Sequence, residues 1–468
     1  MEGAGATMAR LNVCVAAAYG SHGDVQPMYA LALTMARRGH KVALFVSSKH
    51  AARLLAREDA AELAETVVID EPDVEDLWSP GKWGGIVKGP KAVARRWLLT
   101  ARPLYAAIQA RLLNDGTDVV VAHPLNFAAR MLHDSTGVPF ATVALAPWLL
   151  RSRHQCFGWP LVAQGKWAPP WLKGFGYRVL DLLLDSLVVP GELGLRKMYD
   201  DLVVPEHAAV VEHATTAPPP PPARVLDSWF HSPQCILGLW PAWYYPAQPD
   251  WPSQLVQCGF PLFDESSASG DDMDGDLAAF VAKEDKPLVV VTPGTTNPLL
   301  CTTEFFDAAL AAVESAGARA LLLTPHAPAV DAAPRYAAMR GKGDALQVAY
   351  APLSAVLKRA ARAALVHHGG IGTTAQALRS GTPSVVLANA FDQFDNAWAV
   401  AEHLGCGVRC VARAFVSDAS VASAAVRSVL ASASLRARAL AVSARFADAS
   451  ALAAASSAVE KLAARAAS

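Results

Sequence analysis

Short apolar runs that end in small residues alternate along the chain with helix-length segments. The run LNVCVAAAYG (11–20) predicts a buried strand, and the loop SHGDVQP follows it. MYALALTMARRGH then predicts a helix, with Pro27 in its first turn and Gly39 at its stop. The run KVALFVS (41–47) predicts the next strand. This order of strand, helix and strand is typical of a parallel sheet covered by helices.

The same order starts again after a polar segment, DESSASGDDMDGD (264–276). KPLVVVTPGTT (286–296), AALVHHGGIGTT and PSVVLANA (383–390) each predict a strand that leads into a loop of small residues. We therefore expect an α/β protein made of two Rossmann-like halves, with sites at the carboxyl ends of their strands. The expected divisions are a first domain at 1–263, a linker at 264–285, a second domain at 286–445 and a helical tail at 446–468.

Composition narrows the class of protein. The 468 residues are 53% hydrophobic and 18% charged, which suits large folded cores. A formal net charge of −1 does not favour nucleic acid as a partner. The seven cysteines are dispersed, as expected for reduced thiols in a cytoplasm. Neither a secretory signal nor an apolar run of ~18 residues is evident, so we expect a cytoplasmic protein that is soluble or lies on a membrane.

The stretch HHGGIGTTAQALRSG predicts a turn that opens a helix near Ile371. Free backbone N–H groups and the positive end of the helix dipole would favour a diphosphate there. Gly370 and Gly372 would let the backbone approach the anion closely, and His368 could donate a hydrogen bond to it. The hydroxyls of Thr373 and Thr374 could add donors. The alternative is an ordinary strand-to-helix turn that these threonines cap.

Asp392 and Gln393 follow the next strand along the chain. A carboxylate and an amide together can bind vicinal sugar hydroxyls, because the amide adds donors to the acceptors of both groups. Asp395, close behind, fits a helix cap better. A phosphate site beside a hydroxyl-binding site indicates a sugar nucleotide as the ligand.

These segments resemble a known family. The stretch from Tyr350 to Gln393 resembles the donor-binding signature of family 1 glycosyltransferases of GT-B fold, and it has the length of that signature. GSHGDVQP (20–27) resembles the matching loop of the sterol and antibiotic branch. The segment 231–264 is most similar to the rhamnosyltransferases that build bacterial rhamnolipids. The resemblance implies two Rossmann-like domains that face a central cleft, and a nucleotide-sugar co-substrate.

The resemblance also implies roles for single residues. His368 and the turn at 370–374 would hold the diphosphate. Asp392 and Gln393 would hold the transferred sugar. The nucleobase of the donor would lie along Ala351 to Leu353. The remaining donor contacts implied are Gly23, Thr295, Thr296, Tyr350 and Gln376. Plant members carry Trp, Gln, Asn and Glu at positions 350, 353, 372 and 376, so ribose recognition and the choice between uracil and thymine stay open. UDP-glucose is the favoured donor, and dTDP-rhamnose is the second candidate.

A glycosyltransferase needs a base for the acceptor hydroxyl. Asp24 stands where the antibiotic branch has an Asp and plant members have the catalytic His, so it is our candidate; a helix cap is the alternative. His22 is a second candidate, and His123 could contact Asp24 or the acceptor, although a histidine at the edge of the core is the simpler interpretation. Direct displacement would invert the anomeric centre. We expect no metal requirement, because the helix terminus, His368 and the Thr hydroxyls can stabilise the charge on the leaving group.

The first half of the chain is rich in tryptophan, which suits a pocket for a lipophilic acceptor such as a sterol, a hydroxy-fatty acid or a polyphenol. Trp83, Trp97 and Trp148 are candidate contacts. The stretch 166–188 mixes cations, Trp and Leu, and it is either an interfacial helix that meets a membrane or a cover over the acceptor site. A GT-B sugar-nucleotide epimerase, an NAD-dependent oxidoreductase and a non-catalytic sugar-nucleotide binder are the alternative functions.

Overall fold

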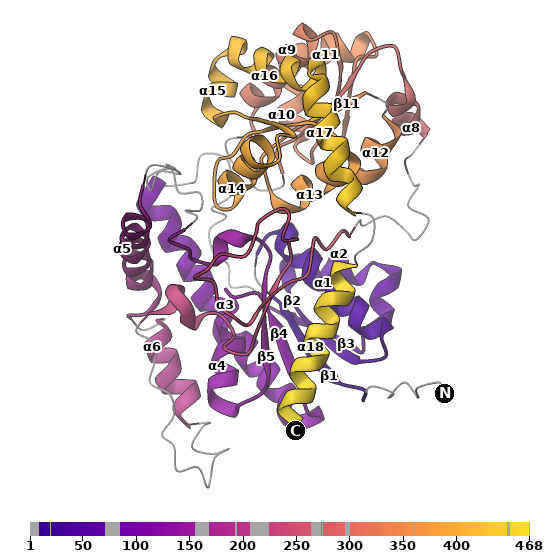
Figure 1. The fold of residues 1–468 in the computed structure, drawn as a ribbon. Coiled ribbons are helices and arrows are strands. Elements are labelled where there is room, and N and C mark those ends of the chain that lie inside the picture. Colours follow the sequence, from indigo (N-terminus) through magenta and orange to yellow (C-terminus); the bar gives the residue numbers. More distant parts are fainter. Residues whose placement is uncertain are drawn as a thin grey trace, which may run out of the picture.

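A computed structural model gives the architecture of the chain (Figure 1). It describes residues 9–18, 20–70, 85–154, 168–191, 194–205, 224–263, 273, 275–294, 300–360, 362–446 and 450–467. Two sheets lie one above the other in Figure 1, and all strand pairs described in them are parallel. Both sheets have helices packed on them, as expected from the sequence.

The first sheet has the strand order β3-β2-β1-β4-β5-β6-β7. Its strands are β1 (Asn12–Ala17), β2 (Lys41–Ser47), β3 (Glu65–Ile69), β4 (Val119–Ala122), β5 (Phe140–Ala144), β6 (Cys235–Gly238) and β7 (Leu255–Gln257). Its helices include α1 (His22–Arg37), α2 (Ser48–Leu55), α3 (Gly85–Asp115), α4 (Phe127–Thr136), α5 (Pro170–Val188) and α6 (Leu195–Met198). Short helical turns are η1 (Glu58–Glu62), η2 (Pro147–Leu149), η3 (Tyr199–Val203) and η4 (Val225–Trp229).

The second sheet has the order β10-β9-β8-β11-β12-β13. In each sheet the order in which the strands are added reverses beside the first strand, as in Rossmann folds. Its strands are β8 (Leu288–Thr292), β9 (Arg319–Leu323), β10 (Ala345–Val348), β11 (Ala363–His367), β12 (Ser384–Val386) and β13 (Gly407–Arg409). The helices are α8 (Gly275–Ala282), α9 (Thr303–Ser315), α10 (Ala327–Asp331), α11 (Pro334–Gly341), α12 (Leu353–Arg359), α13 (Ile371–Ser380), α14 (Gln393–Trp398), α15 (Ala412–Ser417), α16 (Ala419–Ala431), α17 (Ala433–Ser443) and α18 (Ala451–Ala467), with turns η5 (Ala399–His403) and η6 (Ala444–Phe446).

The first helix differs from its prediction. We expected SHGDVQP to be a loop, but α1 begins at His22 and Pro27 lies inside it. The reason is local: Ser21 precedes the helix and its backbone N–H and hydroxyl both donate to Asp24, which caps the first turn. Pro27 lies near the start of the helix. Because it has no N–H, the helix lacks the hydrogen bond that this group would donate to the carbonyl of Gly23. The predicted strand at 41–47 is confirmed as β2.

Aromatic residues join the two halves of the molecule. Tyr244 is fully buried and packs edge-on against Phe260, which stacks on Phe446. Tyr245, also buried, packs against Trp398 of the second half with 5.7 Å between ring centroids. One hydrophobic core therefore runs from the first sheet into the second half, so the two halves are held together by apolar burial.

The last helix returns to the first half. In Figure 1, α18 lies beside α1 and across the first sheet, although α17 belongs to the second half. Glu460 of α18 is buried and forms an ion pair with Arg38 at 2.7 Å. It also lies 2.9 Å from His40 Nε2, a contact that is an ion pair when the imidazole is protonated. The chain thus crosses between the halves a second time. The domain limits predicted from the sequence stay predictions.

Candidate functional site

The carboxyl ends of the strands in the two halves face each other. Asp24 follows β1, and Trp148 follows β5 in the first half; Asp392 follows β12 in the second. The ring of Trp148 lies 6.0 Å from that of Phe391, centroid to centroid, across the boundary. Asp24 is close enough to Asp392 to influence its ionisation. The structure therefore brings together residues that are more than three hundred positions apart.

Asp24 is held in one orientation by its own helix turn. The backbone N–H of Ser21 donates to Asp24 Oδ2 at 2.6 Å, and the Ser21 hydroxyl donates to the same oxygen at 2.9 Å. Gly20 has a φ of +113°, and a Cβ on it would lie 2.5–2.7 Å from atoms of the Asp24 side chain. Only glycine therefore fits at position 20 without moving the carboxylate. Both capping hydrogen bonds end on Oδ2, so Oδ1 remains for the proton of an acceptor hydroxyl.

His123 lies near Asp24 and is buried. Burial lowers the pKa of this imidazole to about 4, against the opposing effect of Asp24. The N–H of Leu125 donates to His123 Nδ1 at 3.3 Å, which places the proton of the neutral ring on Nε2. Neutral His123 is thus suited to donating a hydrogen bond. His22, the second candidate base, lies with its ring 6.2 Å from that of His50. The catalytic roles of all three residues stay predictions.

The start of α13 has the features of an anion site. Gly370 is its N-cap and provides no side chain to cap the first turn. Gly372 is exposed and Thr373 is half-buried, so ligand can reach this turn. Thr374 differs from expectation, because it is fully buried and its hydroxyl donates to the Gly370 carbonyl at 2.9 Å. The geometry therefore favours Thr373 over Thr374 as a phosphate contact.

His368 packs directly on two glycines beside this turn. A Cβ on Gly294 would lie 2.7 Å from the His368 ring, and one on Gly370 would lie 2.5 Å from it. Burial lowers the pKa of His368 to about 4, so it would meet a phosphate as a neutral donor. Its Nδ1 is buried and takes part in no hydrogen bond within the described residues. Such an orphaned atom is one that a ligand can satisfy.

Asp392 is the most strongly perturbed carboxyl group of the site. Burial, and next the charge of Asp24, raise its pKa from 3.8 to about 7. Hydrogen bonds from Asn396 and from the N–H of Ile371 oppose this rise. The neighbouring Gln393 accepts hydrogen bonds through Oε1 from the N–H groups of Asn389 (2.9 Å) and Ala390 (3.0 Å). Because Oε1 of Gln393 is used within the loop, the side-chain Nε2 is the group that could donate to a sugar hydroxyl.

Asn396 is a residue that the sequence analysis missed. It is fully buried, and its Nδ2 donates to Gly369 O and to Asp392 Oδ2, both at 2.8 Å. Its Oδ1 accepts the hydroxyl of Tyr244 at 2.7 Å. This single amide thus connects the glycine turn, the acidic loop and the first half of the molecule. Its position four residues after Asp392, on the same face of α14, was the available signal.

The other predicted donor residues lie around this centre. Tyr350 is 48% exposed, with the Arg53 guanidinium of α2 5.5 Å from its ring centroid. Ala351 is buried, Leu353 begins α12, and Gln376 is buried on α13. Gly23 is exposed in the first turn of α1. The predicted contacts Thr295, Thr296 and Trp83 lie outside the described residues.

The acceptor candidates separate into two environments. Trp148 reaches the boundary between the halves through Phe391, as described above. Trp97 instead packs edge-on against Phe127 of the first half, with 6.1 Å between ring centroids, and borders the hydrophobic core. Its ring contact with Phe391 across the boundary favours Trp148 over Trp97 as an acceptor contact.

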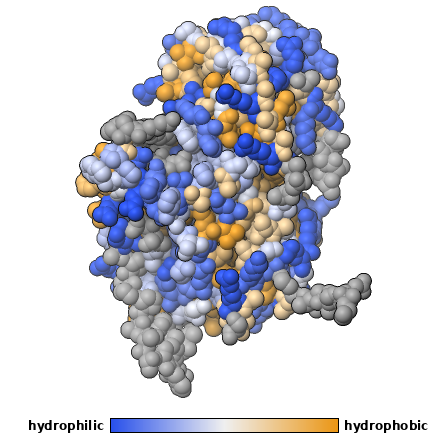
Figure 2. Space-filling model, viewed as in Figure 1, coloured by the Kyte–Doolittle hydropathy of each residue, from blue (hydrophilic) through white to orange (hydrophobic). Residues whose placement is uncertain are grey.

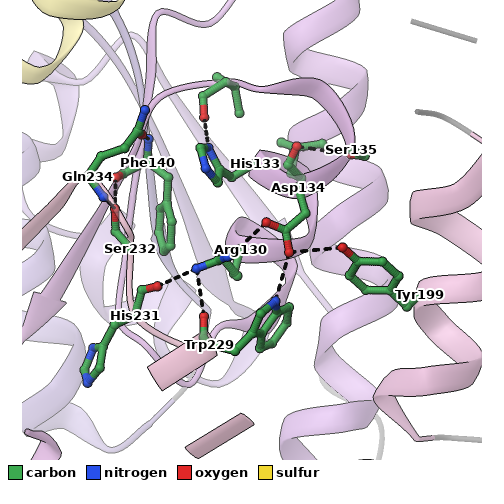
Figure 3. Close-up of polar contacts among 12 residues, drawn as sticks. Arg130, His133, Asp134, Ser135, Phe140, Tyr199, Trp229, His231, Ser232 and Gln234 are labelled. Atoms are coloured by element: carbon green, nitrogen blue, oxygen red, sulfur yellow. Dashed lines mark hydrogen bonds and ion pairs between the residues drawn. The ribbon is translucent and has the colours of Figure 1, made fainter. Parts of the chain in front are cut away.

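A polar network around Arg130 and Asp134 joins α4 to the segment 229–231 (Figure 3). Arg130 of α4 pairs with Asp134 at 2.9 Å and donates to the carbonyls of Trp229 (3.0 Å) and His231 (2.8 Å). The Trp229 indole N–H donates back to Asp134 at 2.9 Å. Buried His231 in turn contacts the carbonyl of Leu149 at 3.1 Å through Nε2. The network thus fixes the chain that backs the turn η2.

In the described part of the chain, no group of three or more His, Cys, Asp or Glu side chains is placed to hold a metal ion. Within the same residues, the helices are too short or too polar to cross a bilayer. The predictions on metal requirement and on localisation stay predictions.

Comparison with known proteins places this geometry in a family. Residues 14–155 match the glycosyltransferase family 28 N-terminal domain, and residues 333–462 match the C-terminal domain of erythromycin biosynthesis protein CIII-like proteins. The chain is a GT-B glycosyltransferase. These matches support the predicted resemblance to the antibiotic branch of family 1. These matches do not show a closer relation to rhamnolipid enzymes or to the sterol branch.

Individual relatives agree with this assignment. The glycosyltransferase is 27% identical over 400 residues to O-mycaminosyltylonolide 6-deoxyallosyltransferase of Streptomyces fradiae, covering 79% of this chain and 78% of the relative. The kitacinnamycin glycosyltransferase structure matches with a TM-score of 0.64 and 20% identity, over 97% and 99% of the two chains. The Streptomyces sp. SF2575 enzyme SsfS6, complexed with thymidine diphosphate, matches with a TM-score of 0.55 and 16% identity, over 95% and 99%. These matches give no support to the epimerase and oxidoreductase alternatives.

Proposed function

We propose that this glycosyltransferase transfers a hexose, with inversion, from a nucleoside diphosphate sugar to a hydroxyl of a lipophilic natural product. The observation that carries the proposal is the placement of Asp24 beside Asp392, across the boundary between the two halves. One half thereby supplies a base, and the other supplies the predicted sugar and phosphate contacts. Each is incomplete without the other.

The chemistry follows from these positions. The acceptor oxygen attacks the anomeric carbon while Asp24 takes the hydroxyl proton. The bond from that carbon to the diphosphate oxygen breaks, and its electron pair leaves with the nucleoside diphosphate. Attack from the face opposite the leaving group inverts the centre. The N–H groups at the start of α13, with His368 and Thr373, would stabilise the charge that develops on the leaving group.

Asp392 would serve as the sugar contact and would respond to the donor. In the free protein its pKa of about 7 leaves it partly protonated at neutral pH. Sugar hydroxyls that donate to it would favour the carboxylate, as hydrogen bonds from Asn396 already do. Gln393 would add its amide N–H to the same sugar. Donor binding is thus expected to lower the pKa of Asp392.

The nucleotide and the sugar are the finer parts of the proposal. UDP-glucose is the favoured donor, and dTDP-rhamnose is the second candidate because residues 231–264 resemble rhamnosyltransferases. The thymidine diphosphate bound to SsfS6 supports including dTDP in the test. Exposed Tyr350 would offer a ring face to either base.

The acceptor is proposed to be a lipophilic hydroxyl compound. The Streptomyces fradiae relative, by its name, transfers 6-deoxyallose to O-mycaminosyltylonolide, which supports testing natural-product acceptors here. Trp148 and Phe391 at the boundary supply aromatic surface for such a molecule. Sterols, hydroxy-fatty acids and polyphenols belong in the same screen.

The test is a screen of donors against acceptors, read by mass spectrometry of the product. UDP-glucose, dTDP-rhamnose and dTDP-glucose are combined with the acceptor classes above, and thermal shift with UDP, dTDP and NAD reports binding directly. Asp24→Asn is expected to lower kcat by about 100-fold or more while nucleotide binding persists. Exposed Asp70 of the same half provides the matched control, and Asp70→Asn should leave kcat unchanged.

Three outcomes would contradict the proposal. Stabilisation by NAD alone would remove the sugar-nucleotide site. Product of retained configuration would exclude direct displacement. Near-normal kcat in Asp24→Asn would remove Asp24 from the role of base, and His22 would then be the next variant to test.

A further inference from the structure

Helix α5 presents apolar side chains to the outside of the molecule. Five large side chains are exposed on it: Trp171 (71%), Phe175 (61%), Val179 (42%), Leu182 (63%) and Leu183 (62%). Their spacing of three to four residues, apart from the adjacent pair at the end, places them on one side of the helix. We call this set the α5 outer face. Figure 1 places α5 at the edge of the first half, and apolar residues reach the surface at that edge in Figure 2.

The opposite side of α5 carries its acidic residues. Asp181 is buried and accepts hydrogen bonds from Arg151 at 2.8 and 3.0 Å. Asp185 is also buried and accepts from the N–H groups of Val225 (3.2 Å) and Leu226 (3.1 Å), at the start of η4. These contacts fasten the helix to the protein through carboxylates. The usual arrangement of a surface helix, apolar inward and charged outward, is therefore reversed over its second half.

The charged side chains of α5 that solvent reaches are positive. Arg178 is exposed and Lys173 is half-buried, whereas both aspartates of α5 point inward. Arg153 lies against Gly174, where a Cβ would come within 3.6 Å of it; its side chain is 61% exposed and lies 3.7 Å from the Asp250 carboxylate. The surface thus combines an apolar stripe with adjacent cations. This combination is complementary to an anionic lipid surface, in which apolar chains lie beneath acidic headgroups.

We propose that the α5 outer face binds the surface of an anionic membrane, with the helix lying in the plane of the headgroups. Nineteen residues of helix give a contact about 28 Å long. Trp171 at one end suits the interface between headgroups and acyl chains. Because both aspartates are already paired within the protein, the helix can be seated without exposing a carboxylate to lipid. The proposal does not depend on glycosyl transfer, although it would bring the enzyme to acceptors dissolved in a bilayer.

Vesicle flotation tests this surface directly. The full chain is mixed with vesicles of phosphatidylcholine alone or with 30% phosphatidylglycerol, at low and high salt. Binding is expected to the anionic vesicles and to weaken with salt. Phe175→Ser with Leu182→Ser should lower the partition coefficient at least tenfold. Leu113→Ser is the matched control, since Leu113 is 70% exposed on α3 of the same half and is not part of the α5 outer face.

The variants must keep their fold, which circular dichroism, thermal unfolding and nucleotide-induced thermal shift report without lipid. Equal binding by the α5 variant and the wild type would overturn the proposal, as would absence of binding to anionic vesicles. Loss of a dimer in the α5 variant, seen by light scattering without lipid, would assign the face to a second copy of the chain instead. Failure of glycosyl transfer in the separate donor screen would leave the vesicle result unaffected.

Discussion

Replacing Asp392 with asparagine should stabilise the free protein at neutral pH while it abolishes sugar transfer. The folded pKa of about 7 lies above the ordinary value of 3.8. Between these pH values the folded protein keeps a proton that the unfolded chain has lost. Stability therefore falls as pH rises from about 4 to about 7, and the deficit is complete above pH 7. Asparagine cannot ionise, so the variant escapes this loss.

The size of the effect follows from the two pKa values. At about 1.4 kcal/mol for each tenfold change in proton affinity, their difference corresponds to about 4 kcal/mol above pH 7. This is an upper limit, because water reaches part of Asp392. The hydrogen bond from Asn396 Nδ2 is conserved in the variant, since asparagine offers one carbonyl oxygen. The wild type and the variant should unfold alike near pH 4.

Thermal unfolding at a series of pH values from 4 to 9 measures the difference. The variant should gain several degrees in Tm at pH 8 and almost none at pH 4. Asp24→Asn is the control for the coupling, because removing its charge should lower the pKa of Asp392 and shrink the gain in a double variant. A gain that is the same at every pH, or a variant less stable than wild type at pH 8, would refute the reasoning.

Three further variants test other contacts. Gly20→Ala should push the Asp24 carboxylate aside, because the alanine Cβ would lie within 2.7 Å of it. We expect kcat to fall about 100-fold while circular dichroism stays near normal, and an unchanged kcat would contradict the placement of Asp24. Tyr244→Phe should leave Asn396 Oδ1 unpaired, which destabilises the protein by about 1–3 kcal/mol and raises the KM for donor more than it changes kcat, as steady-state kinetics would show. Glu460→Gln should loosen α18 by about 2 kcal/mol, with faster amide exchange in that helix than in α17; equal protection in both proteins would count against the role of the ion pairs.

Much of the site could be predicted because its signals are local. A glycine turn between a strand and a helix, such as 369–372, specifies its own geometry. Asp392 and Gln393 lie a few residues past the end of β12, so the chain itself keeps them near the edge of the sheet. The start of α1 differs from its prediction, because Pro27 favours a first helical turn at its own position, whereas Ser21 and Asp24 form a capping box that starts the helix earlier.

The contacts that escaped prediction join distant parts of the chain. Tyr244 and Asn396 are 152 residues apart, and neither is distinctive where it stands in the sequence. The raised pKa of Asp392 depends partly on Asp24, which only domain packing brings near. On α5 the sequence shows cations, leucines and aspartates, but which side points inward depends on Arg151 and on the start of η4.

The sequence by itself determined the two parallel sheets and the small-residue turns at their strand ends, because hydrophobic periodicity and glycine conformations act over a few residues. It also identified the acid in each half that the site brings together. Only the tertiary structure decided that Asp24 and Asp392 share an environment, that Asn396 links three segments, and that α5 turns its apolar side outward. These features depend on burial and charge between segments far apart in the chain, and such interactions exist only once the halves have packed.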